Sequence, residues 1–105
     1  MSKIVFEKDG TEYTLEFDRR ACEVAESRLG LSLSDVLNGK LTLFPALFQA
    51  AFLKNHPKVG HQRIMEIFND MKNKQALYEA LVTMYAECVS TLVDDEGNET
   101  DWTTE

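Results

Sequence analysis

The chain has 105 residues, of which 44% are hydrophobic, and this length and composition fit one domain with a single core. Its formal net charge is −7, but residues 94–105 hold six acids and no base, so residues 1–93 are nearly neutral, with twelve acids against eleven bases. A body without a clustered basic surface argues against a nucleic-acid-binding protein.

The alternating pattern of residues 3–17 predicts a β-hairpin. Asp9 and Gly10 supply the two positive-φ positions of a type I′ turn. With this turn the numbers of paired residues sum to 19, so Phe6 faces Tyr13 on an apolar face that should lie on helices. The hairpin is then either a structural lid or an open edge strand that accepts another chain.

Helical patterns follow the hairpin. We expect Asp18 to cap the first helix and Gly30 to end it, Ser32 or Ser34 to cap the second, and Thr42 to cap the third. We therefore expect an α+β, mostly α fold, with the hairpin packed on a bundle of four to five helices in one globular domain, residues 1–93. The expected helices span about 19–29, 34–38, 43–55, 61–71 and 75–93.

Residues 43–53 form an apolar run with one polar side chain in eleven. On a helical wheel, one half of the run holds its bulky side chains, and the other half is Ala-rich. The bulky half consists of Leu43, Phe44, Leu47, Phe48, Ala51 and Phe52, and the Ala-rich half of Ala46, Gln49, Ala50 and Leu53. The Ala-rich half either packs inside the monomer or meets another helix or subunit. We hypothesise that surplus aromatic and methionine side chains form a partner groove or a self-association surface, at Phe44, Phe48, Phe52, Met65 and Phe68.

The reactive residue types do not combine into a recognisable catalytic site. Cys22 and Cys88 lie in helical patterns, which is typical of buried free thiols in a reducing compartment. His56 and His61 are not spaced as a helical zinc pair and have no third ligand nearby. There is no phosphate-binding loop and no recognisable nucleophile triad. We therefore expect no catalytic, metal or cofactor residues.

Residues 94–105 have the composition of an acidic, flexible tail. The alternative is a tail that docks a partner around Trp102. The chain starts without a long apolar signal region, and its longest apolar run is too short to span a bilayer. We expect a soluble cytoplasmic protein that does not bind membranes.

The order of these segments resembles the tail assembly chaperones of long-tailed, siphovirus-type phages and prophages. The resemblance extends over nearly the whole chain, and its motifs are structural rather than chemical. It rests on the hairpin sequence Phe6–Phe17, on Glu23–Glu26 and Gly30–Leu33, on Phe44–Phe52 and Ile64–Ile67, and on Leu81–Tyr85 with the terminal Trp102.

This resemblance implies a non-catalytic protein with a small N-terminal β element on a helical body. Such chaperones hold the tape measure protein soluble in the host cytoplasm while tail tube subunits polymerise around it, and they are absent from the finished virion. A longer, frameshifted form recruits the tail tube protein. The implied partners are therefore the tape measure protein and the tail tube protein. The apolar run of residues 43–53 separately leaves a homo-oligomer as a candidate.

A second class of function stays open. The chain can instead be a small intracellular interaction module, an adaptor or inhibitor that binds through its hairpin edge or its acidic tail. Such a module would lose binding when residues 94–105 are deleted. A chaperone that binds through its body would keep it.

Overall fold

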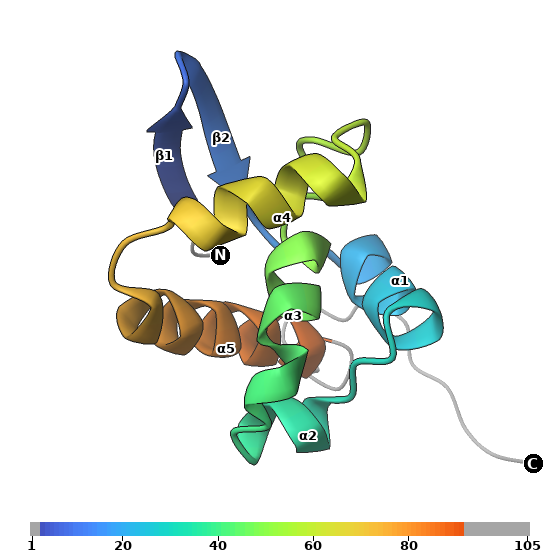
Figure 1. Ribbon diagram of the computed structural model, residues 1–105. Coiled ribbons are helices and arrows are strands. Elements are labelled where there is room, and N and C mark those ends of the chain that lie inside the picture. The colour runs from blue at the N-terminus through green and yellow to red at the C-terminus, as the bar shows by residue number, and fades with distance from the viewer. Residues whose placement is uncertain (1–2, 92–105) are drawn as a thin grey trace, which may run out of the picture.

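The structure is a computed structural model that describes residues 3–91 (Figure 1). A two-stranded antiparallel hairpin stands beside a helical body. In this body the helix Phe44–Ala50 packs against three others, Arg19–Arg28, His61–Asp70 and Lys74–Ser90. The α+β, mostly α fold with an N-terminal hairpin is confirmed. The elements are β1 (Ile4–Lys8), β2 (Thr11–Leu15), α1 (Arg19–Arg28), α2 (Leu33–Leu37), the 3₁₀ turn η1 (Leu41–Leu43), α3 (Phe44–Ala50), α4 (His61–Asp70) and α5 (Lys74–Ser90).

The hairpin has the predicted turn and register. Asp9 and Gly10 adopt φ angles of 53° and 80°, as a type I′ turn requires. The numbers of every observed pair sum to 19, among them Phe6 and Tyr13, whose ring centroids lie 5.4 Å apart. Tyr13 and Leu15 are buried, so the apolar face of the hairpin packs on the helices.

Two of the predicted helix caps are present. The Asp18 carboxylate accepts a hydrogen bond from the backbone N–H of Ala21 at 2.7 Å, which satisfies a free donor at the start of α1. The Ser32 hydroxyl does the same for Asp35 at 3.2 Å and begins α2. Gly30 follows α1 with a φ of 71°, a left-handed conformation that glycine adopts without a steric cost.

The prediction of a helix over residues 43–55 is wrong for its second half. α3 ends at Ala50, and residues 51–55 form turns. The Ala51 carbonyl accepts a hydrogen bond from the Glu16 N–H at 3.1 Å, and so it is not used in a further helical turn. Thr42 lies inside η1, and α3 begins without a side-chain cap.

The segment after α3 covers the outer edge of β2. The backbone N–H of Thr14 donates to Nε2 of His56 at 2.9 Å. Nδ2 of Asn55 donates to the Thr14 carbonyl at 3.3 Å. Side chains thus replace a third strand along this edge, and they explain why the chain leaves the helical path where it does.

The other helices start and end close to their predicted bounds. α1 and α4 each end one residue before the predicted bound, and α2 is shifted by one residue at both ends. α5 starts one residue earlier than expected and ends at Ser90, three residues before the predicted end. Asn73, which precedes α5, has a φ of 51°. The left-handed backbone there redirects the chain between α4 and α5.

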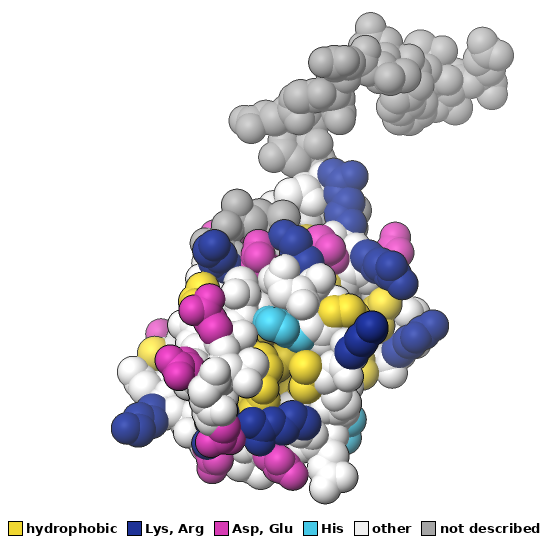
Figure 2. Space-filling view, turned by 90° about the horizontal axis from the view of Figure 1, so that it is seen from above, with side chains coloured by type: hydrophobic (Ala, Val, Ile, Leu, Met, Phe, Trp, Pro, Cys, Tyr) yellow, Lys and Arg dark blue, Asp and Glu magenta, His cyan; other side chains and the backbone are white. Residues whose placement is uncertain are grey.

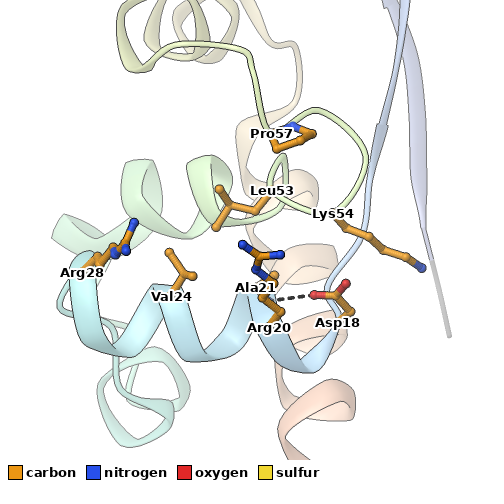
Figure 3. A pocket seen from close by; sticks show the side chains of 8 residues that line it. All are labelled: Asp18, Arg20, Ala21, Val24, Arg28, Leu53, Lys54 and Pro57. Carbon is orange, nitrogen blue, oxygen red and sulfur yellow. Dashed lines mark hydrogen bonds between the residues drawn. The ribbon is translucent and has the colours of Figure 1, made fainter.

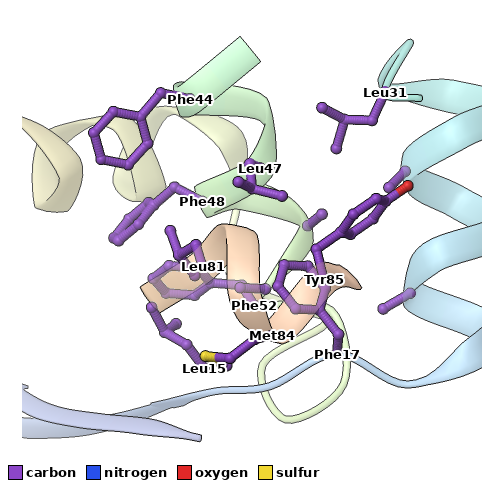
Figure 4. Packing of buried hydrophobic residues seen from close by; sticks show 14 of the residues in the cluster. Leu15, Phe17, Leu31, Phe44, Leu47, Phe48, Phe52, Leu81, Met84 and Tyr85 are labelled. Carbon is purple, nitrogen blue, oxygen red and sulfur yellow. The ribbon is translucent and has the colours of Figure 1, made fainter. Parts of the chain in front are cut away.

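The core lies where the hairpin base meets α3, α4 and α5 (Figure 4). Figure 4 shows side chains of α3 and α5 pointing toward one another, with Leu15 and Phe17 entering beside them. Aromatic rings in it meet edge-on, as with Phe17 and Tyr85 at 5.4 Å. The largest fully buried side chains are Tyr85, Phe17, Phe48, Phe52, Leu15, Leu47, Ile67, Leu81 and Cys88.

The Ala-rich half of the apolar run packs mainly within the monomer. Ala50 has no exposed surface. Ala46, Gln49 and Leu53 are half-buried. Of the two alternatives for this half, intramolecular packing therefore holds at Ala50, while a narrow strip that includes Leu53 stays accessible.

The two cysteines are free and buried, as expected. Cys22 lies on α1 and Cys88 on α5. Burial raises the pKa of the Cys22 thiol, and its contact with Cys88 raises that pKa further. The reactive thiolate is therefore disfavoured at neutral pH.

Tyr85 carries a buried hydroxyl group whose oxygen has no hydrogen-bond partner within residues 3–91. Burial raises its pKa to about 12. Replacing Tyr85 with Phe keeps the ring contact with Phe17 and removes the unsatisfied group. We expect the free energy of unfolding at pH 7 to rise by about 1 kcal/mol in urea titrations.

The same substitution should change how stability depends on alkaline pH. Below about pH 10 the tyrosine keeps its proton in both states. As the pH rises from 10 toward 12, the Tyr85 hydroxyl loses its proton in the unfolded chain before it does so in the folded one. The free energy of unfolding of the wild type therefore falls over this range. The Tyr85→Phe variant should lose less stability over this window. An equal loss in both proteins would show that this hydroxyl is not buried.

Candidate functional site

Three of the predicted interaction residues lie in the core. Phe48 and Phe52 have no exposed surface, and Phe44 is only 9% exposed. The rings of Phe48 and Phe52 meet at 5.2 Å, in an edge-on arrangement. The expectation that these three phenylalanines form a partner groove is therefore wrong, because the rest of the domain already buries them.

The other two predicted residues of the body are half-buried. Met65 and Phe68 lie on α4 and pack against the core. The ring of Phe68 lies 4.8 Å from that of Phe44, and the Lys74 ammonium group sits 5.8 Å from its centre. Phe68 therefore forms the outer edge of the core. The remaining residue, Trp102, and the acidic residues 94–105 lie outside the described part of the chain.

A groove that none of these predictions named runs between α1 and the turns after α3 (Figure 3). Its volume is about 480 Å³. Figure 3 shows side chains of α1 facing Leu53 and Pro57 across the groove. Its lining combines apolar side chains with three basic side chains and one carboxylate. The lining residues are Asp18, Arg20, Ala21, Val24, Arg28, Leu53, Lys54 and Pro57.

The basic side chains of the groove differ in how far they are already neutralised. Lys54 donates to the Glu16 carboxylate at 3.0 Å. A hydrogen bond from Asn55, followed by that of Lys54, holds the pKa of Glu16 below its ordinary value. Within the described residues, neither Arg20 nor Arg28 takes part in an ion pair. These two guanidinium groups and the carboxylate of Asp18 are the groove charges that form no ion pair there, and a ligand would meet all three.

The spacing of the α1 residues contains a signal for this groove. Arg20, Val24 and Arg28 follow one another at intervals of four, which places them on one face of a helix. The residues on the opposite side of the groove could not be predicted from their spacing in the sequence. Leu53 and Lys54 reach the groove only because the chain turns after Ala50.

The whole chain, residues 1–105, matches a family model described as a domain of unknown function, DUF5055. The chain belongs to the DUF5055 family. No curated protein and no solved structure matches it.

Charges on the DUF5055 domain are mixed. In the space-filling view, Lys and Arg side chains are interspersed with Asp and Glu (Figure 2). Ion pairs tie several of them together, such as Lys8 with Asp70 at 2.9 Å and Arg63 with Asp9 at 3.0 Å. On the face shown, basic and acidic side chains alternate and do not form a broad basic surface.

Both histidines of the DUF5055 chain have structural contacts. His56 accepts the hydrogen bond from Thr14, and Nδ1 of His61 lies 2.8 Å from Oε1 of Gln49. In residues 3–91, no three His, Cys, Asp or Glu side chains gather where they could hold a metal ion. Nor does this part of the chain contain a helix with the length and apolarity that crossing a membrane requires.

Proposed function

We propose that the protein is a non-catalytic phage tail assembly chaperone, which binds the tape measure protein in the host cytoplasm and supports assembly of the tail tube. The order of segments along the chain resembles that of such chaperones. One observation carries the proposal further: the groove beside α1 is lined in part by apolar side chains and holds two arginines without ion pairs among the described residues.

The groove suits an amphipathic helix with acidic side chains along one edge. Val24 and Leu53 are half-buried and offer apolar contacts, and Arg20 and Arg28 offer charge-assisted hydrogen bonds to carboxylates. The two arginines are eight positions apart on α1, a distance of about 12 Å at the helical rise. The groove therefore matches about two turns of a bound helix. A tape measure protein is long and helical with apolar stripes, so it offers many such segments.

The contacts of the reactive residues support a non-catalytic role. The Cys22 thiol has a raised pKa and is buried, so it makes a poor nucleophile. His56 uses its Nε2 to hold β2 in place. A protein that only binds another protein does not require reactive cysteine or histidine side chains.

The second candidate is a small interaction module that binds through its hairpin edge or its acidic tail. One observation favours it, since the outer edge of β1 is open in the described structure while that of β2 is covered. The two functions differ in the part of the chain that they require. A chaperone that binds through the groove should not need residues 94–105.

Co-expression with the tape measure protein of the same phage or prophage tests the proposal. We expect the tape measure protein to be mostly insoluble alone, and to become soluble and co-purify when this chain is present. The variant lacking residues 94–105 should have the same effect. If the full chain leaves the tape measure protein insoluble, the chaperone proposal is wrong. If only the deletion abolishes capture, the tail is the binding element.

A further inference from the structure

The outer edge of β1 carries backbone groups that point away from the hairpin. Along an antiparallel pair, residues alternate between bonding across the pair and pointing outward. The N–H and carbonyl of Thr14 point outward, because they bond to His56 and Asn55. Val5 is paired with Thr14, so its N–H and carbonyl point to the outer side of β1, as do those of Glu7 two residues on.

These outward groups of β1 are free. Over the part of the chain described, the backbones of Val5 and Glu7 make no hydrogen bond beyond the hairpin. The side chain of Val5 is 50% exposed beside them. A strand edge in this state is a template for a further strand. Because the outer edge of β2 is covered, a further strand can pair with the sheet only along β1.

We propose that two copies of the chain pair through these edges, with their β1 strands antiparallel and Val5 opposite Val5. The sequence of β1, together with Lys3 directly before it, complements itself in this register. Lys3 of each copy faces Glu7 of the other, which places two opposite-charge pairs on the solvent face. On the face toward the helices, Ile4 of each copy is opposite Phe6 of the other. The result is a four-stranded sheet across a two-fold axis.

Neighbouring registers do not complement themselves in this way. Outward groups recur every second residue, so the strands can slip only in steps of that length. A slip toward the hairpin tip would place Val5 opposite Glu7 and Ile4 opposite Lys8. Both opposite-charge pairs would be lost, and charged side chains would face apolar ones. The register centred on Val5 is therefore the one that we expect.

A hollow beside β1 leaves room for the second copy. Its volume is about 410 Å³, and it lies between the start of β1 and α5. In the proposed register, Phe6 of the second copy lies next to Ile4 on the helix-facing side, above this hollow. Small side chains of α5 leave space for the ring there. The lining residues are Lys3, Ile4, Ala76, Glu79, Ala80, Thr83 and Met84.

Sedimentation equilibrium of the full chain, from micromolar to millimolar concentration at low salt, tests this pairing. The wild type should be a reversible dimer. Lys3→Glu and Glu7→Lys each bring like charges together twice, and each should raise the dimer dissociation constant roughly tenfold. Mixing the two variants restores both opposite-charge pairs, so the mixture should dimerise like the wild type. The double variant K3E/E7K should do so alone.

Glu12→Lys is the matched control for Glu7→Lys. The two residues face each other across the hairpin, so either change relieves the same repulsion and alters the net charge equally. Of the two, Glu7 is the one on β1. The E12K variant should dimerise like the wild type, whereas E7K should not. A monomeric wild type, equal dimerisation of E7K and E12K, or a mixture of K3E and E7K that stays monomeric would each overturn the proposal.

Discussion

Replacing Phe48 with Asp should unfold the domain. The Phe48 side chain has no exposed surface, and its ring lies 5.2 Å from both Phe52 and Phe68. A carboxylate at this position would be buried without a partner, which costs more than most domains can lose. The milder Phe48→Ala change should lower the free energy of unfolding by about 3–5 kcal/mol, measured in urea titrations followed by circular dichroism.

Leu41→Asp provides the matched control. Leu41 is 66% exposed, so the same charge at this position should change stability by about 0.5 kcal/mol or less. A Phe48→Asp variant with the wild-type unfolding midpoint would contradict the core described above. That result would mean that Phe48 lies at the surface, as the sequence-based hypothesis of a partner site required.

Reversing the charges of Arg20 and Arg28 should weaken tape measure binding at least about tenfold. Each change replaces an attraction to acidic side chains of the partner with a repulsion. In the double variant R20E/R28E, the two changes act oppositely on the dipole of α1. The new carboxylate at position 20 would lie near the start of the helix, where a negative charge is favourable, and the one at position 28 near its end, where it is not. We therefore expect the domain to remain folded, which thermal unfolding can verify.

The double variant K40E/K72E is the control for this experiment. Lys40 and Lys72 are exposed and lie outside the groove, and their reversal changes the net charge by the same amount. Binding titrations at one salt concentration should show near-wild-type affinity for this control. Equal losses in the two double variants would mean that overall charge governs binding and that the groove does not.

The parts of the fold set by local chemistry could be predicted from the sequence. The Asp9–Gly10 turn determines the hairpin register, because only one pairing places the apolar side chains on one face. Asp18 and Gly30 mark the ends of α1 by satisfying or redirecting backbone groups within a few residues. These signals need no knowledge of the rest of the chain.

The parts set by distant contacts could not be predicted. α3 ends early where Ala51 bonds to Glu16, a residue 35 positions away in the chain. The same turn brings Leu53 to the groove. The aromatic pattern identified Phe44 and Phe48 correctly as apolar and helical, but periodicity cannot tell the side of a helix that faces the core from one that faces a partner.

The most direct test of the proposed function is whether the purified chain and the tape measure protein form one complex. Size-exclusion chromatography with light scattering would measure its mass after co-expression. We predict that both proteins elute in a single peak whose mass exceeds that of either alone, and that the tape measure protein precipitates when this chain is omitted. Separate elution, with a tape measure protein that is equally soluble with or without this chain, would contradict the chaperone proposal.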